Sequence, residues 1–220
     1  GSTTTGAGNT AVGAEALKAN TTASNNTAIG KGCGDNITTA SFCTLVGMNI
    51  DTANAVDSNA NGIGYGIVAT GGYTTIGLTT SDIRAAHGNT TWATVSDKRV
   101  KKDITDAEAG LSFINDLRPR TFKYKTKGDL PEEFDAYEEG STETYKNEFT
   151  NHGFIAQEVK EAVDNHPELK DGFKMWDIRE DTGQQEVGEA AVIPVLVKAV
   201  QELSTQVDEL KQELLALKGE

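Results

Sequence analysis

Ser96 lies within six residues of three lysines, Lys98, Lys101 and Lys102, and no histidine is near it in the sequence. A serine hydroxyl becomes a nucleophile only when a neighbouring group takes its proton. A lysine can take that proton if burial or nearby cations lower its pKa from about 10.4 toward neutrality, and Arg99 adds a further cation. A Ser–Lys nucleophilic pair is one interpretation of this segment. A turn or a helix cap is the other, and Ser-Asp before basic residues more often forms such a structure.

The composition changes at this serine. Residues 1–96 carry three basic and five acidic side chains and 15 of the 23 glycines, and residues 97–220 carry the remaining charges. Gly1-Ser2 is typical of an expression remnant and is set aside. We therefore predict two domains, one over residues 3–95 and one over residues 96–220, with Ser96 at the boundary between them.

Charge and composition exclude several classes of function. The net charge of −13 argues against nucleic acid as a partner, because phosphate binding needs a basic surface. No stretch of 18 apolar residues is present, so we expect no membrane partner. Cys33 and Cys43 are the only cysteines, and we expect them to be small packing residues. The three histidines are scattered without metal-ligand spacing, so we expect neither a metal nor another cofactor.

The first half contains a repeat. Asn-Thr-Ala-Val-Gly at residues 9–13 returns as Asn-Thr-Ala-Ile-Gly at 26–30 and, altered, at 43–47 and 62–64. The four glycines that end these copies are 17 residues apart, and a fifth copy ends 13 residues later at Gly77. Each unit is too small to bury its own apolar face, so the repeat predicts a stacked β-solenoid or β-roll. Each of these glycines fits a corner that needs a positive φ or a close approach of the next coil.

A Gly/Thr/Asn-rich disordered linker is the alternative for this half. It does not explain why a β-branched residue precedes every repeat glycine in a fixed register. The motif resembles the repeats of trimeric adhesin heads and phage tail fibres over roughly residues 9–78, which implies an all-β trimeric stalk. An exposed Thr/Asn/Tyr surface, including Tyr65 and Tyr73, could contact a host-surface glycan.

The second half has the pattern of a small α+β domain over residues 96–188. Residues 105–108, Thr-Asp-Ala-Glu, predict a capping box that opens a helix with an apolar stripe of Leu111, Ile114 and Leu117. A strand is expected over residues 121–125, an acidic exposed insertion over 126–148, and a second helix from residue 153 to His166. Residues 173–178 and 185–187 flank Asp-Thr-Gly and predict a hairpin.

A heptad pattern ends the chain over residues 189–218. Its apolar residues step alternately by three and four, with Pro194 expected in the first turn. The eight members are Ile193, Leu196, Val200, Leu203, Val207, Leu210, Leu214 and Leu217. A monomer's core helix would show a wider stripe, so the strict seam favours a coiled coil. The packing rules alone favour a dimer, which Leu214 at an a position weakens.

The order of these parts carries a stronger signal than any one of them. A Gly-rich repeat is followed by Ser-Asp-x-Arg-x-Lys, Arg-Pro-x-Thr-Phe-x-Tyr, Gly-Phe-Ile-Ala-Gln-Glu-Val and the terminal heptad helix. Over roughly residues 95–217 this resembles the intramolecular chaperone auto-processing domain, the S74 self-cleaving peptidases of phage tail spikes and tail fibres. The acidic insertion at 126–148 departs from that pattern and is expected not to touch the chemistry.

The resemblance implies a homotrimer, which replaces the dimer that the heptads alone favour. Its folding client would be its own N-terminal stalk, in a virion tail fibre or spike assembled in the host cytoplasm. The family's Ser–Lys dyad falls on Ser96 and Lys101. Asp97 and Arg99 match the same box and are expected to shape the loop. Gln157 and Glu158 match the second block, with a supporting role.

Two scissile bonds stay open. Attack on the Val95 carbonyl closes an easy five-membered ring, whereas the family resemblance favours the bond between Ser96 and Asp97. At that second bond Ser96 would reach its own carbonyl only through a four-membered ring, unless a neighbouring protomer supplies the hydroxyl. The competing hypothesis for the whole chain is a non-enzymatic trimeric fibre tip or adhesin that binds a host glycan.

Overall fold

The computed structural model describes residues 5–169 and 171–219, and the chain forms two compact units, residues 1–104 and 105–220. The sequence predicted a domain boundary between residues 95 and 96, at the expected cleavage site, whereas the compact units divide after Ile104. The cleavage site itself stays a prediction. Among the residues described, no helix is both long and apolar enough to cross a membrane.

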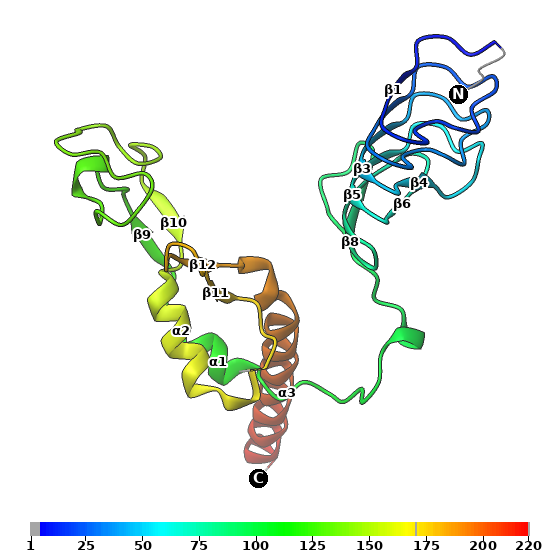
Figure 1. The fold of residues 1–220 in the computed structure, drawn as a ribbon. Helices are drawn as coiled ribbons and strands as arrows, with labels where there is room; N and C mark the ends of the chain where they lie inside the picture. The colour runs from blue at the N-terminus through cyan, green and yellow to red at the C-terminus, as the bar shows by residue number, and fades with distance from the viewer. Residues whose placement is uncertain (1–4, 170, 220) are drawn as a thin grey trace. The chain divides into compact units, whose positions relative to one another are not determined.

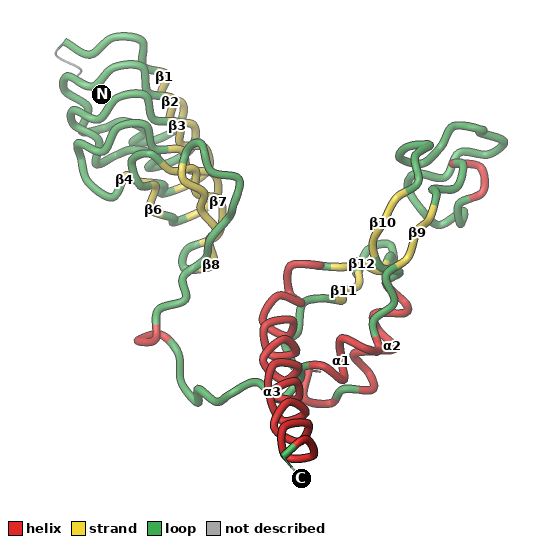
Figure 2. Tube along the Cα trace, turned by 180° about the vertical axis from the view of Figure 1, so that it is seen from behind, coloured by secondary structure: helices red, strands yellow, loops and turns green. Residues whose placement is uncertain are grey.

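The first unit is a β-solenoid-like stack in which each repeat contributes one strand (Figures 1 and 2). The main sheet has the order β1-β2-β3-β5-β7-β8, and a smaller parallel pair joins β4 to β6. The strands are β1 Thr10–Val12, β2 Thr27–Ile29, β3 Thr44–Met48, β4 Asp51–Thr52, β5 Asn61–Tyr65, β6 Val68–Ala69, β7 Tyr73–Leu78 and β8 Ser81–Ala86. All pairs from β1 to β7 are parallel, which confirms the predicted β-solenoid.

The register of the sheet is the register of the sequence repeat. Thr10, Thr27 and Thr44 pair with one another across three strands, 17 residues apart. The glycine that ends each copy has a positive φ, as expected, and Gly47 has φ 141°. A Cβ on Gly47 would lie 1.8 Å from the carbonyl oxygen of Gly64 in the next coil, so only glycine fits.

Polar side chains bind each coil to its neighbour at the same spacing. The Asn26 N–H donates to Asn9 Oδ1 at 3.0 Å, and the Cys43 N–H donates to Asn26 Oδ1 at 2.9 Å. Similarly, the Ser24 N–H donates to Ser41 Oγ at 3.0 Å. These bonds satisfy backbone donors that a solenoid corner would otherwise bury without a partner. They explain why Asn and Ser recur with the repeat.

The two cysteines pack in the solenoid core, as predicted. Cys33 and Cys43 are free and buried, beside apolar residues such as Leu45 and Ile50. Burial raises the pKa of both thiols, which makes them unreactive toward oxidants and metals.

A strand that the repeat did not predict closes the stack. β8 is antiparallel to β7, with Ile76 opposite Ile83, and it ends the series of parallel strands. Beyond it, the Arg84 N–H donates to the Ala93 carbonyl at 2.9 Å, and the Ala93 N–H donates back at 2.8 Å. This segment covers the edge of β7 that would otherwise be open to another chain.

The second unit has a small core between three helices. Helix α1 is Leu111–Asp116, α2 is Ala156–Asn165 and α3 is Ile193–Lys218. Two antiparallel pairs accompany them, β9 Arg120–Phe122 with β10 Asn151–Gly153, and β11 Trp176–Ile178 with β12 Gln185–Val187. The second pair confirms the predicted hairpin, and residues 126–148 form the expected irregular, largely exposed insertion. Short 3-10 turns lie at Lys98–Val100, Lys127–Asp129, Pro167–Leu169 and Glu189–Val192.

The predicted capping box is wrong. Residues 105–108 are exposed loop, and α1 begins only at Leu111. The reason is tertiary: Glu202 on α3 accepts a hydrogen bond from the Leu111 N–H at 2.7 Å and so caps α1 from another element. Phe113 is the fully buried residue of α1. Ile114 and Leu117 of the predicted stripe are partly buried and pack against the same core, and the helix ends at Asp116, just before Leu117. The next strand also begins one residue early and is shorter than expected.

Helix α3 has two different apolar faces. Val195 and Ala199 are buried in the unit's own core. All eight members of the predicted heptad seam are exposed, from Leu196 at 41% to Leu217 at 73%. The seam is therefore separate from the face that packs within the chain. Pro194 lies in the first turn, as predicted.

Candidate functional site

The segment that carries Ser96 and Lys101 folds back on itself through one short turn. A single 3-10 turn, Lys98–Val100, follows Ser96, and Lys101 caps its C-terminal end with its N–H bonded to the Lys98 carbonyl at 3.1 Å. Residues 86–108, all of which the structure describes, contain no buried residue. Local hydrogen bonds rather than core packing therefore set the shape of this segment.

The turn brings the two predicted dyad residues together. Lys101 Nζ donates to Ser96 Oγ at 2.6 Å, across five residues of sequence. This is hydrogen-bond reach for a nucleophile and its base. Both residues are exposed in the single chain. Proton removal from Ser96 would need a neutral Lys101 amine that accepts the hydroxyl proton.

Asp97 and Arg99 shape the loop around this pair. Asp97 Oδ1 accepts from the Arg99 N–H at 2.8 Å, which caps the 3-10 turn, and both carboxylate oxygens accept from the Arg99 guanidinium. The Arg99 hydrogen bonds hold the pKa of Asp97 below its usual value. Both side chains therefore take part in the hydrogen bonds of this turn, and the charge of Arg99 is paired with that of Asp97.

Gln157 and Glu158 lie in the second unit, in the first turn of α2. Glu158 Oε2 accepts from Arg120 Nε at 2.9 Å, and Arg118 lies 3.9 Å from the same carboxylate. The hydrogen bond from Arg120 lowers the pKa of Glu158. Since β9 and β10 also pair here, Glu158 ties the Arg-Pro-x-Thr-Phe block to the Gly-Phe-Ile-Ala-Gln-Glu block.

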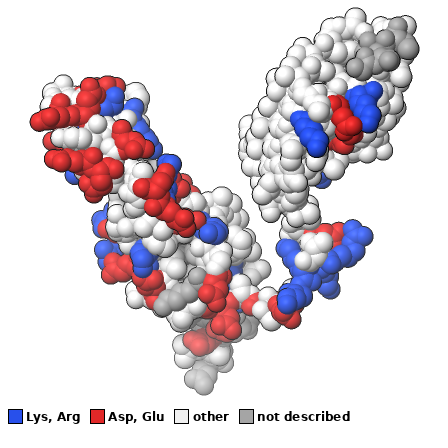
Figure 3. Space-filling view, viewed as in Figure 1, with Lys and Arg blue, Asp and Glu red and all other residues white. Residues whose placement is uncertain are grey.

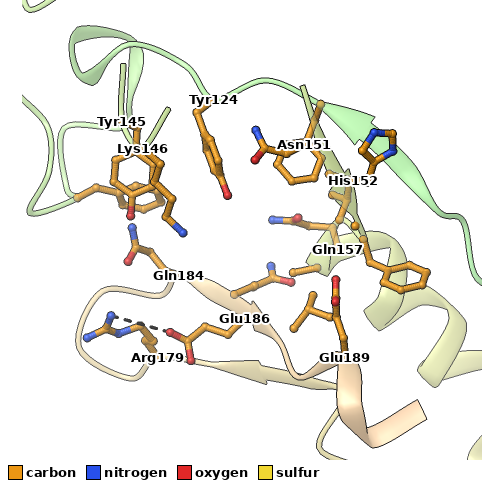
Figure 4. Close-up of a pocket in the computed structure, with 18 residues that line it drawn as sticks. Tyr124, Tyr145, Lys146, Asn151, His152, Gln157, Arg179, Gln184, Glu186 and Glu189 are labelled. Atoms are coloured by element: carbon orange, nitrogen blue, oxygen red, sulfur yellow. Dashed lines mark ion pairs between the residues drawn. The ribbon is translucent and has the colours of Figure 1, made fainter. Parts of the chain in front are cut away.

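Gln157 lines an open cavity of about 860 Å³ within the second unit (Figure 4). Tyr124 and Tyr145 meet edge to face there with ring centres 5.9 Å apart, and Lys146 lies over both rings. On another side of the cavity, Arg179 pairs with Glu186 at 3.9 Å. Gln157 therefore lies in the lining of this cavity, together with residues from several elements of the second unit.

Within the described ranges, no group of three or more His, Cys, Asp or Glu side chains could hold a metal ion.

A family model supplies the independent comparison. Residues 96–167 match the model of peptidase S74, described as chaperone of endosialidase. The chain carries a chaperone-of-endosialidase domain. No curated protein and no solved structure matches the chain.

Membership of this domain in the family supports a chaperone role in the folding of a phage tail fibre, and so a tail-associated protein. The family is associated with autoproteolytic serine peptidase activity. The matched segment of the chaperone-of-endosialidase domain begins at Ser96 and includes Lys101, Gln157 and Glu158. The Gly-rich repeat lies outside it.

The roles of two residues of the second unit were not predicted from the sequence. Arg120 is the partner of Glu158 and stands at the undetermined position of Arg-Pro-x-Thr-Phe. Glu202 caps α1 from 91 residues away. Arg120 could have been noticed as a second arginine within the Arg-Pro-x-Thr-Phe block, whereas no local pattern marks Glu202 as a cap.

Proposed function

We propose that this chain belongs to a phage tail fibre or spike, and that its second domain trimerises, helps the stalk to fold, cuts the chain at Ser96 and is then released. Ser96 is the nucleophile and Lys101 the general base. The single observation that carries this proposal is the 2.6 Å contact between Lys101 Nζ and Ser96 Oγ at the first residue of the family match.

The exposed heptad seam supports the trimer. Eight apolar side chains on one stripe of α3 are 41–73% exposed in the described part of the chain, and the helix uses a different face for its own core. A stripe with this spacing is the a/d face of a coiled coil. Partner copies of α3 would bury it, and a trimeric cap would raise the effective concentration of the three stalk ends.

Trimer assembly could also control when cleavage occurs. In the single chain Lys101 is exposed, and a hydrated lysine keeps its proton at neutral pH. Burial disfavours the charged form and lowers a lysine's pKa. Neighbouring copies that cover the Ser96 loop would therefore turn a resting Ser–Lys contact into a reactive one. Once the chaperone domain has been cut away, the stalk could no longer refold after unfolding. The folded, assembled stalk would therefore be kinetically trapped.

The bond that breaks is proposed to be Ser96–Asp97. There the Ser96 hydroxyl of a neighbouring protomer would attack the Ser96 carbonyl, pass its proton to neutral Lys101, and form an ester as the Asp97 amine leaves with a proton. Water then hydrolyses the ester. The alternative at Val95–Ser96 is an N-to-O acyl shift within one chain, followed by the same hydrolysis. The two products differ by one serine residue, so intact mass distinguishes them.

The test is a denaturing gel with intact mass of four purified chains. We expect the wild-type chain to give two bands split near residue 96, and Ser96→Ala and Lys101→Ala to give one full-length band with association unchanged. Lys102→Ala is the matched control, because Lys102 is an equally exposed lysine next in sequence whose only close partner in the described chain is Asp103 at 3.9 Å. It should cut normally.

The outcomes separate the competing hypotheses. Complete cleavage of Lys101→Ala would end the dyad. A single stable band from the wild-type chain would favour a non-enzymatic fibre tip, in which the repeats contact a host glycan and the second unit is an anchor.

A further inference from the structure

The open cavity of about 860 Å³ in the second unit is built from three segments of the chain. Strands β9 and β10 with the start of α2 form one wall, the β11–β12 hairpin forms another, and the insertion at 126–148 forms the third. Its volume lies in the range of roughly 300–1,000 Å³ that is typical of small-ligand sites. The hairpin lies beyond the family match, which ends at residue 167. At least one wall of the cavity is therefore not part of the matched segment.

Aromatic rings line one side of this cavity. Phe122 and Tyr124 meet edge to face with ring centres 5.5 Å apart, and Tyr124 meets Tyr145 in the same way at 5.9 Å. Both tyrosines are half-buried, and neither hydroxyl has a hydrogen-bond partner among the residues described. Figure 4 shows the Tyr124 hydroxyl directed into the open space. The rings thus offer an apolar surface with polar groups at its edge.

Side-chain amides lie across the cavity from these rings. Gln157 and Gln184 point into the same space in Figure 4, and the Gln157 side chain has no hydrogen-bond partner within the described ranges. Gln185 Oε1 accepts from Trp176 Nε1 at 2.8 Å, which orients that amide and leaves its NH₂ group as a donor. An amide carries two donors and an acceptor oxygen, so it suits hydroxyl groups, which both donate and accept.

The charges in the lining balance, and the surroundings of the cavity are acidic. Lys146 and Arg179 stand against Glu186 and Glu189, and Arg179 pairs with Glu186 at 3.9 Å. Residues 126–148 carry eight acidic and two basic side chains, and Figure 3 shows carboxylates gathered over that part of the second unit. An anionic ligand would approach against these charges. The cavity therefore favours an uncharged ligand that is rich in hydroxyl groups.

We propose that this cavity is a carbohydrate-binding site that takes a short stretch of uncharged glycan. A sugar ring has an apolar C–H face and a rim of hydroxyl groups. Its C–H face would lie against the rings of Tyr124 and Tyr145, and its hydroxyls would bond to the amides of Gln157, Gln184 and Gln185. The site requires neither cleavage at Ser96 nor a trimer. It gives the second domain a binding activity beyond its chaperone role.

The experiment uses the full chain with Ser96→Ala, so that self-cleavage plays no part in the result. The probes are neutral trisaccharides and tetrasaccharides of glucose, galactose, mannose, rhamnose and N-acetylglucosamine, screened at millimolar concentration by saturation-transfer difference NMR. Trisaccharides that contain sialic acid or glucuronic acid are the charged counterparts. We expect at least one neutral saccharide to bind. It should shift the backbone amides of residues 122–124, 145–157 and 184–189 and leave those of the solenoid strands unchanged.

Two substitutions on different walls test the contacts. Tyr145→Ala removes one ring and should weaken binding about tenfold. Gln184→Glu keeps the size of the side chain but removes its amide donors, and it should weaken binding about fivefold. Tyr137→Ala is the matched control, because Tyr137 is a half-buried tyrosine of the same insertion outside the cavity lining. It should bind the saccharide as the parent chain does.

The outcomes decide this proposal separately from the proposed function. Failure of every neutral saccharide to bind at millimolar concentration would overturn it, as would binding of the charged saccharides alone. Shifts confined to the solenoid amides would place the glycan on the repeats instead and would also overturn the cavity as its site. Equal weakening by Tyr137→Ala and Tyr145→Ala would contradict the assigned contacts. None of these results bears on cleavage at Ser96, which the denaturing gel measures without any saccharide.

Discussion

The solenoid and helix α3 are both built on sequence repeats, yet they satisfy those repeats in opposite ways. In the solenoid, each 17-residue coil finds its partner in the next coil of the same chain, through strand pairs and side-chain ladders such as Asn9 to Asn26. In α3, the seven-residue repeat leaves every member exposed. Stacked repeats bury one another's apolar faces within a single chain. The apolar stripe of a single straight helix can be buried only by helices of other chains.

The largest expected loss of stability comes from substituting one glycine at which two coils of the solenoid meet. Gly47→Ala would place a Cβ 1.8 Å from the Gly64 carbonyl oxygen at φ 141°, so a coil must move. We expect the first unit to lose about 4 kcal/mol or more of its unfolding free energy. Hydrogen exchange of the β3 and β5 amides would measure the loss.

Gly72 gives the control for this change. It also has a positive φ, 78°, but nothing lies within 4 Å of a Cβ built on it. Gly72→Ala should therefore cost only the backbone term, about 1–2 kcal/mol. Equal losses at the two glycines would show that close stacking of coils does not decide the fold.

For α3, the corresponding test is to weaken association through the heptad seam by substituting Leu210. Leu210 and Leu215 are 63% and 62% exposed, and only Leu210 is in the heptad seam. Burying one leucine is worth roughly 1.5–3 kcal/mol. Leu210→Asn should thus weaken association by about tenfold to a hundredfold per contact, measured by sedimentation equilibrium. Leu215→Asn should leave association unchanged; equal weakening would mean that the seam is not the interface.

The same contrast explains what the sequence could predict. The strand positions, the positive φ at the repeat glycines and the length of α3 follow from periods of 17 and seven residues, which local packing enforces. Spacing alone left Lys98, Lys101 and Lys102 as candidate partners of Ser96, and only the family resemblance singled out Lys101, which the turn places at Ser96 Oγ. β8 was missed, since closing a stack needs a strand that breaks the repeat.

The start of α1 was mispredicted because a long-range contact, not the local sequence, determines where the helix begins. Residues 105–108 have the residue types of a capping box, but the helix begins where Glu202 meets the Leu111 N–H. A contact across 91 residues leaves no local pattern. The pairing of Glu158 with Arg120 was unforeseen for the same reason, although both residues lie in motif blocks.

The cap itself gives a smaller expected effect. Glu202→Ala leaves the Leu111 N–H without its acceptor and should cost the second unit about 1–2 kcal/mol. The measurement is urea unfolding followed by exchange of the α1 amides. Glu213→Ala, at an exposed site on the same helix, makes the same change in helix propensity and should stay within about 0.5 kcal/mol. Matching losses at the two sites would contradict a specific cap.

The smallest expected effect is a pH dependence confined to the second unit. His166 is buried; Nε2 lies 2.9 Å from Asp116 and Nδ1 3.0 Å from Glu168, with the Phe113 ring edge to face beside it. Burial alone would lower the pKa of His166, but hydrogen bonds to the two carboxylates outweigh it and raise that pKa above its usual 6.5. The protonated imidazole therefore stabilises the folded state.

The sign of the pH dependence follows from that raised pKa. The contribution is fully present below pH 6.5 and is lost as the pH rises through the higher folded-state value. Urea midpoints of the α1 and α2 amides should thus fall from pH 6 to pH 8.5, while those of the solenoid strands stay level. His166→Gln should flatten the fall, and His152→Gln, at an exposed histidine of the same unit, should keep it. A midpoint that rises with pH over this window would show that the two carboxylates do not hold the imidazolium, because only the charged ring gains from facing both.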